Sequence, residues 1–123
     1  MALILIVDDS ATQALNLSRI MKRHGHEVLT ARDGAEGVSC ARAELPDLII
    51  MDVVMPRLNG FQATRQLSRD AGTCHIPIIL VTTKDQESDA LWGKRQGAKA
   101  YLVKPVDEDL LIDTIKKLLD SGA

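Results

Sequence analysis

The sequence is poor in aromatic residues and in cysteine. Phe61, Trp92 and Tyr101 are its three aromatic side chains, so the core must be built from aliphatic side chains. The two cysteines, Cys40 and Cys74, have neither the spacing of a redox pair nor that of a metal site. We therefore expect both to be reduced and structural.

The chain also lacks a long hydrophobic run and a large excess of either charge. The first apolar run, residues 2–7, has no basic leader and is too short for a signal peptide or a membrane span, so a cytoplasmic location without membrane insertion is expected. The net charge of -2 gives no electrostatic reason to expect binding to nucleic acid. A chain of 123 residues has room for one core, and we expect a single domain, 1–123, with no fused output domain.

The most informative segment is residues 46–56, with the sequence PDLIIMDVVMP. Four apolar residues lead into Asp52, and Pro56 follows four positions later. A short apolar run bounded by prolines is typical of a strand that is buried on both faces of a parallel sheet. Asp52 would then lie at the carboxyl edge of the sheet, where ligands bind in such folds. A simple turn-forming role for Asp52 is the alternative from this segment alone.

Similar apolar runs predict strands at residues 3–7, 77–81 and 100–103, and residues 27–31 are a short strand candidate around Val28 and Leu29. Helical patterns lie between and after these strands, and they predict helices at about residues 10–24, 35–44, 61–70, 90–96 and 107–118. Five strands that alternate with five helices imply an α/β fold with a parallel sheet covered on both faces.

The first helix has clear start and stop signals. Ser10 and Gln13 have the spacing of a capping box, in which each side chain binds the other residue's backbone N–H. Gly25 supplies the stop. The predicted inner face of this helix consists of Leu17, Ile20, Met21 and His24.

Four of the five predicted strands end in a residue with reactive or charged chemistry. The first ends at Asp8 and Asp9, the third at Asp52, the fourth at Thr82 and the fifth at Lys104. The strands are expected to be parallel, so all of these side chains should emerge at the same edge of the sheet. A single polar residue at a strand end can be there simply because the strand end meets solvent. Four strands with such endings are difficult to explain in this way.

These residue types fit the transfer of a phosphoryl group. Neighbouring carboxylates repel one another unless a cation is present, and Mg²⁺ binds through one or two carboxylates while it keeps exchangeable waters. Asp8 and Asp9 can hold the metal, and Asp52 can act as a nucleophile towards phosphorus. Lys104 and Thr82 can bind the charged phosphoryl oxygens.

The sequence resembles the receiver domains of two-component response regulators, in particular the stand-alone CheY-like kind. The matching segments are Val7-Asp8-Asp9-Ser10, Met51-Asp52 with Met55-Pro56 and Gly60, Val81-Thr82, and Lys104-Pro105. They cover almost the whole chain in the order and spacing of that family. The resemblance implies a doubly wound (βα)5 flavodoxin-like, CheY-like three-layer sandwich with the strand order 2-1-3-4-5.

The resemblance also implies a metal site and a phosphoacceptor. Asp52 would accept the phosphoryl group from a phosphohistidine on a CheA-like sensor histidine kinase. Asp9, Asp52 and the backbone carbonyl of Val54 would bind Mg²⁺, whereas Asp8 would act through water. In this family such a domain is a signalling phosphoacceptor with intrinsic phosphotransfer and autodephosphorylation chemistry, and it is not counted as an enzyme.

The remaining matched positions would form the conformational switch that responds to phosphorylation. The resemblance implies that Lys104 pairs with the phosphate, that Thr82 swings towards it, and that Tyr101 turns inward behind Thr82. A half-buried strand aromatic is the alternative interpretation of Tyr101. The output would be a changed face formed by the fourth helix, the fifth strand and the fifth helix, which binds a downstream protein. The protein would be a monomer or a weak dimer.

A narrower resemblance concerns surface and helix residues. The segments GFQATRQL (60–67), TTKDQ (82–86) and WGKRQGA (92–98) are similar to those of PilH-type regulators, which act in type IV pilus twitching motility through a chemotaxis-like pathway. This resemblance predicts a motility or signalling protein as the downstream partner.

Two positions beside the expected phosphate affect its lifetime. Val54, two residues after Asp52, is apolar and cannot orient an attacking water, which predicts slow self-dephosphorylation. Lys84, two residues after Thr82, could stabilise nearby negative charge, although the sign of its effect on the rate stays open. Val54 also argues against a phosphatase that depends on a polar side chain at that position.

Other functions remain as alternatives. A haloacid-dehalogenase-like phosphatase would need a second acid where Val54 stands, and in a flavin-binding flavodoxin-like protein Asp8 and Asp9 would repel the flavin phosphate. A phosphate sink for the same kinase and a phosphate-independent binding module both stay open.

Overall fold

A computed structural model describes residues 1–121 of the chain. Its elements are β1 (Leu3–Val7), α1 (Ala11–Arg23), β2 (Glu27–Ala31), α2 (Gly34–Glu44), β3 (Leu48–Met51), α3 (Gly60–Arg69), β4 (Ile78–Thr82), α4 (Glu87–Gln96), β5 (Ala100–Val103) and α5 (Glu108–Ser121). Within these residues no helix combines the length and the apolar character needed to cross a membrane. The five predicted strand–helix pairs are confirmed.

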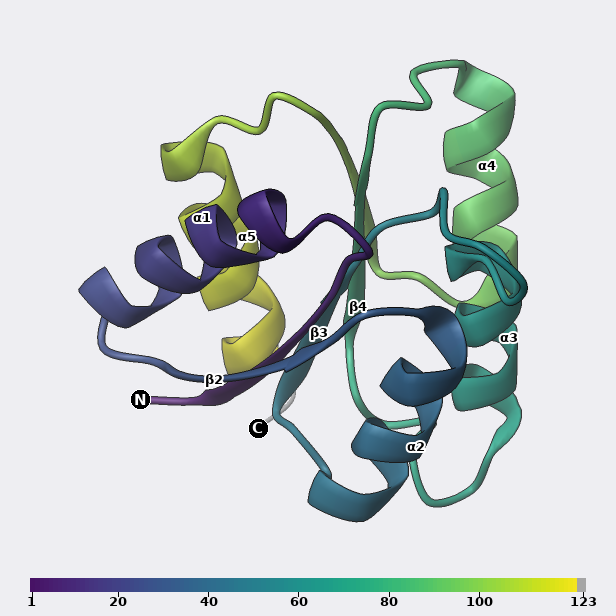
Figure 1. The fold of residues 1–123 in the computed structure, drawn as a ribbon, viewed down its shortest axis with the longest axis horizontal. Coiled ribbons are helices and arrows are strands. Elements are labelled where there is room, and N and C mark those ends of the chain that lie inside the picture. Colours follow the sequence, from purple (N-terminus) through teal and green to yellow (C-terminus); the bar gives the residue numbers. More distant parts are fainter. Residues whose placement is uncertain (122–123) are drawn as a thin grey trace.

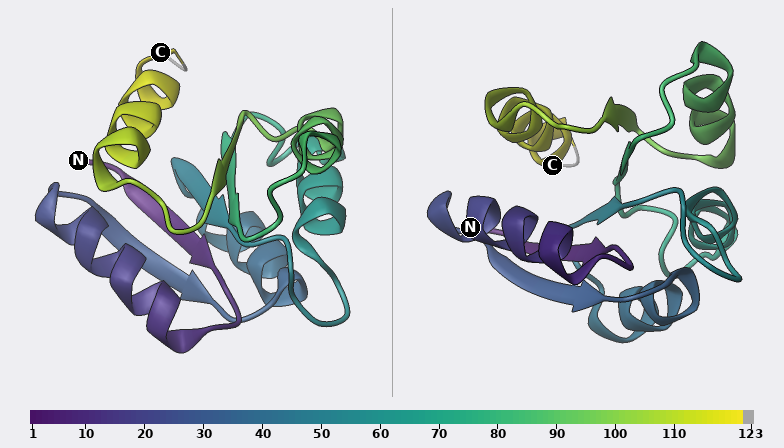
Figure 2. Two further views of the ribbon diagram at one scale, coloured as in Figure 1. Left: turned by 90° about the horizontal axis from the view of Figure 1, so that it is seen from above. Right: turned by 45° about the horizontal axis from the view of Figure 1, so that its top comes forward.

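The strands form one parallel sheet with the order β2-β1-β3-β4-β5 (Figure 1). Helices α1 and α5 cover one face of the sheet, and helices α2, α3 and α4 cover the other, as the two views in Figure 2 also show. This is the three-layer sandwich with the strand order 2-1-3-4-5 that the resemblance to receiver domains implied. Because all strands are parallel, their carboxyl ends meet at one edge.

The sheet separates two aliphatic cores, and each strand contributes alternate residues to them. In β1, Ile4 and Ile6 pack in the core below α1 and α5. Leu5 and Val7 pack in the core below α2 and α3. All four side chains are fully buried. The period-2 alternation of a strand therefore decides which helical layer each side chain meets.

The capping box predicted for Ser10 and Gln13 is half formed. The Ser10 hydroxyl accepts a hydrogen bond from the Gln13 backbone N–H at 3.3 Å. The Ser10 backbone N–H, however, donates to Asp8 Oδ1 at 2.9 Å, so it does not bind the Gln13 side chain. A complete capping box occurs instead at the start of α3, between Asn59 and Gln62. The sequence predicted the start of this helix at about residue 61 and did not identify its capping residue.

Two smaller predictions also differ from the structure. His24 does not lie on the inner face of α1, because it is the residue at which the chain leaves the helix, and its ring is exposed beside Glu108 of α5. The fourth strand begins one residue later than expected and includes Thr82, whose side chain is fully buried.

Candidate phosphoacceptor site

Five residues that the sequence singled out lie at the carboxyl edge of the sheet. Asp8 and Asp9 follow β1, Asp52 follows β3, Thr82 ends β4, and Lys104 follows β5. Backbone bonds extend the ladder to this edge, since the Asp8 N–H donates to the Ala31 carbonyl and the Asp52 N–H to the Val7 carbonyl.

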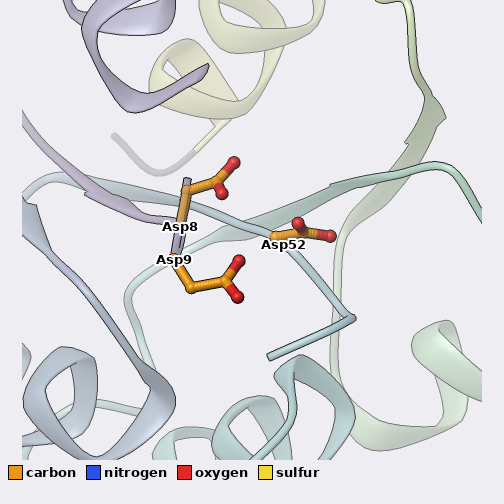
Figure 3. A group of neighbouring side chains, drawn as sticks. All are labelled: Asp8, Asp9 and Asp52. Carbon is orange, nitrogen blue, oxygen red and sulfur yellow. The ribbon is translucent and has the colours of Figure 1, made fainter. Parts of the chain in front are cut away.

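The three carboxylates form a compact acidic group (Figure 3). One oxygen from each of Asp8, Asp9 and Asp52 lies within 4.8 Å of the others. Asp8 is 3% exposed, Asp52 is half-buried and Asp9 is exposed. Asp8 Oδ1 accepts the Ser10 N–H at 2.9 Å, and Asp52 Oδ1 accepts the Val54 N–H at 3.3 Å. The backbone of the two following turns therefore orients two of the three carboxylates.

Lys104 is the cation of this group. Its Nζ lies 3.0 Å from Asp8 Oδ2 and 3.2 Å from Asp52 Oδ2, and it also donates to Gln13 Oε1. The Lys104 side chain is 13% exposed. Three carboxylates thus face one ammonium, and most of their negative charge is unbalanced. A divalent cation with oxygen ligands would fit this donor set.

Lys104 pairs with Asp8, which directly follows β1, while no ion pair joins it to the next residue, Asp9. Asp8 continues the series of Ile6, which faces α1 and α5, whereas Asp9 continues the series of Val7, which faces α2 and α3. In Figure 3 both carboxylates extend toward the side on which Asp52 lies. Within residues 1–121, Asp9 forms no ion pair. Consecutive acids therefore have different surroundings.

Thr82 and Tyr101 lie on the face of the sheet that α4 covers. The Thr82 hydroxyl accepts the Lys84 N–H at 3.4 Å, and the Tyr101 hydroxyl donates to the Lys84 carbonyl at 2.8 Å. The half-buried Tyr101 ring packs against the core below α2 and α3. Burial, followed by the charges of Asp89 and other nearby acids, raises the pKa of Tyr101 to about 12. Lys84, in the loop after β4, thus links the two side chains, since its N–H binds Thr82 and its carbonyl binds Tyr101.

The two positions expected to affect phosphate lifetime differ in their surroundings. The Val54 side chain is 56% exposed, two residues beyond Asp52. Lys84 Nζ lies 3.8 Å from Asp89 Oδ1 on α4. The structure therefore places Lys84 with α4 and not in the acidic group.

Gly60 has a steric role that the sequence motif did not explain. A Cβ at Gly60 would lie 2.2 Å from the Asp52 carbonyl oxygen and 2.7 Å from Val53 Cα. The Gly60 N–H also donates to the Val53 carbonyl at 2.9 Å. The start of α3 is thereby packed directly on the backbone of Asp52.

Gln13 is a site residue that the sequence prediction assigned to helix capping. Its side chain accepts a hydrogen bond from Lys104, and the Ser10 N–H that a capping box would offer it donates to Asp8 instead. Sequence spacing could not reveal this, since the competition involves a side chain from the strand end and a lysine from a distant strand.

The chain belongs to the response regulator receiver domain family, whose model matches residues 4–116. It is therefore a receiver domain, and the acidic group lies where that family's motifs predicted it.

The chain is similar to several individual proteins that contain receiver domains. The chain is 60% identical to Protein PilH of Pseudomonas aeruginosa over 119 residues, which are 97% of this chain and 98% of that protein. It is 38% identical to the response regulator PleD of Caulobacter vibrioides over 95% of this chain and 26% of PleD. Among solved structures, the chemotaxis protein CheY4 of Vibrio cholerae has a TM-score of 0.89 and 34% identity, covering 96% of this chain and 98% of CheY4. The chain is thus a close relative of PilH.

Proposed function

We propose that the protein is a phosphorylation-switched signalling module whose phosphoacceptor is Asp52. A sensor histidine kinase of the CheA type supplies the phosphoryl group from a phosphohistidine. An Asp52 oxygen attacks phosphorus, the P–O bond forms as the P–N bond breaks, and the imidazole leaves. The observation that carries this proposal is the contact of Asp52 with Lys104 inside a group of three carboxylates.

Asp9, Asp52 and the backbone carbonyl of Val54 are the proposed ligands of Mg²⁺, and Asp8 acts through water. The exposure of Asp9 and its lack of an ion pair among the described residues leave it available for a cation. When bound, Mg²⁺ would supply positive charge to the oxygens of the transferring phosphoryl group.

Lys104 and Thr82 are proposed to hold the phosphoryl oxygens after transfer. Lys104 already contacts Asp52, and Thr82 ends the neighbouring strand. A population change from mostly inactive to mostly active needs about 5 kcal/mol of differential stabilisation. Two or three charge-assisted hydrogen bonds, at roughly 1.5–3 kcal/mol each, supply this amount.

The output surface is proposed to be the face formed by α4, β5 and α5. Large apolar side chains are exposed on all three elements, namely Leu91 (54%), Trp92 (48%), Val103 (42%) and Leu110 (50%). Movement of Thr82 would be transmitted to this face by the loop that holds the Tyr101 hydroxyl. Exposed apolar groups of this kind are typical of protein-binding surfaces.

The proposed pathway is the chemotaxis-like control of type IV pilus twitching motility. The 60% identity to Protein PilH across nearly the whole of both chains supports it, together with the PilH-type segments in α3 and α4. The proposed location is the cytoplasm, and the two free thiols, Cys40 and Cys74, agree with a reducing compartment.

The test of the phosphoacceptor is intact-mass measurement after incubation with acetyl phosphate, with and without Mg²⁺. The wild type should gain one phosphoryl group in Mg²⁺, and Asp52→Asn should gain none. Asp113→Asn makes the same change at an exposed site on α5 and should be labelled like the wild type. A wild type that stays unlabelled after a rapid quench would refute the proposal.

A further inference from the structure

Gln13 and Gln62 occupy equivalent helix positions but have different partners. Each is the third residue of its helix, and each has its backbone N–H bound by the capping side chain, Ser10 or Asn59. Gln62 Oε1 closes its capping box by accepting the Asn59 N–H at 2.9 Å. Gln13 Oε1 instead accepts a hydrogen bond from Lys104 Nζ.

We propose that Gln13 is a positioning residue that holds the Lys104 ammonium on the α1 side of the acidic group, away from Asp9. The inference rests on the proposed function, because it concerns the same Asp52 site. It adds a residue that the receiver motifs in the sequence do not contain.

The hydrogen-bonding capacity of the ammonium supports this role. A lysine ammonium has three N–H donors, and Lys104 has three acceptors, on Asp8, Asp52 and Gln13. Two of these acceptors are charged and belong to the acidic group. Gln13 is neutral and lies outside it, on the first turn of α1. Gln13 therefore anchors the third donor without adding to the negative charge.

Loss of the amide oxygen would free one donor of Lys104. The third carboxylate of the group belongs to Asp9, one of whose oxygens lies within 4.8 Å of an oxygen of Asp8 and of Asp52. An ammonium that turns towards Asp9 competes with a divalent cation for the same oxygens. Gln13 thus keeps Lys104 ready for the phosphoryl group while Asp9 stays open to the metal.

The substitution Gln13→Met removes the acceptor and keeps the length and helix propensity of the side chain. We expect Mg²⁺ to bind this variant about fivefold more weakly, which corresponds to ~1 kcal/mol. Gln62→Met is the matched control, since it makes the same change at the same helix position. It should lower stability through loss of the capping box and leave Mg²⁺ binding unchanged.

A readout independent of phosphorylation is the ¹⁵N NMR signal of the lysine ammonium groups in Mg²⁺-free protein. The Lys104 signal, assigned by its absence in Lys104→Arg, should be sharp in the wild type and in Gln62→Met. It should broaden in Gln13→Met, and Gln13→Glu, which restores an acceptor, should recover it. Calorimetric titration with Mg²⁺ alone gives the second readout.

An unchanged Lys104 signal, or Mg²⁺ binding in Gln13→Met as tight as in the wild type or tighter, would overturn the role of Gln13. These measurements need no phosphodonor, so they are separable from the test of Asp52. If the NMR and Mg²⁺ effects appear while the wild type fails to accept a phosphoryl group, the positioning role stands and the proposed function fails.

Discussion

Substitution of Gly60 by alanine should both destabilise the protein and disturb Asp52, the proposed phosphoacceptor. The added Cβ would lie 2.2 Å from the Asp52 carbonyl oxygen and 2.9 Å from its carbonyl carbon. Carbon atoms in favourable contact are about 3.5–4.0 Å apart, so backbone must move, and no rotamer change can relieve the overlap. Overpacking of this kind costs about 1–3 kcal/mol or more, whereas alanine gains at most about 1 kcal/mol of helix propensity. We expect a net loss of about 2 kcal/mol.

Gly72→Ala is the matched control for this prediction. A Cβ at Gly72 has Asp70 Oδ1 as its nearest neighbour, at an ordinary 3.5 Å. Its free energy of unfolding should stay within about 0.5 kcal/mol of the wild type. Urea unfolding with unchanged m-values would give the change in the free energy of unfolding for each variant. Labelling by acetyl phosphate should be reduced in Gly60→Ala alone. A Gly60→Ala protein as stable as Gly72→Ala would show that the contact between α3 and Asp52 is not rigid.

Three further predictions concern the surroundings of the site. Val54→Asn should shorten the lifetime of the aspartyl phosphate, because an amide can orient an attacking water. Decay of the phosphorylated mass after removal of the donor measures this lifetime, and an equal or longer value would contradict the prediction. The raised pKa of Tyr101, about 12 against an ordinary 10, means that its contribution to stability is complete below pH 10 and falls as the pH rises towards 12. Melting temperatures between pH 8 and 11 should therefore fall less steeply in Tyr101→Phe than in the wild type, and parallel curves would contradict the shift. Glu108→Gln removes an exposed ion pair to Arg23 and an exposed contact with His24, and it should cost less than about 1 kcal/mol. Urea unfolding should detect no difference from the wild type in 1 M salt.

The fold was largely predictable from the sequence because β1, β3, β4 and β5 are short runs of almost entirely apolar residues. Residues 48–51 are buried on both faces of the sheet, so every position in them had to be apolar. The acidic group was predictable for a related reason, since parallel strands bring their carboxyl ends to one edge. Asp8 and Asp52 needed no knowledge of side-chain conformation to be placed together.

Interactions that depend on competition between partners were not predictable. The pattern at Ser10 and Gln13 satisfies the spacing of a capping box, but the Asp8 carboxylate binds the N–H that the box requires. His24 satisfied the helical period, but the helix ended one residue before it. In both cases the local pattern was present, and a neighbour in space or a helix end decided the outcome.

The alternation along β1 has a consequence for how receiver sequences can vary. Asp8 and Asp9 are adjacent in sequence, and in the alternation of β1 Asp8 continues the series of Ile6, on the side of α1 and α5, while Asp9 continues the series of Val7, on the side of α2 and α3. Inserting or deleting a single residue within β1, with the start of the strand held in register, would exchange these sides, so that the proposed metal ligand would be on the side of Lys104 and the acid that pairs with Lys104 would be on the side of the proposed metal. A two-residue change would preserve the directions and alter strand length alone. The chemistry of the pocket is thus sensitive to whether the number of residues in a buried strand is odd or even.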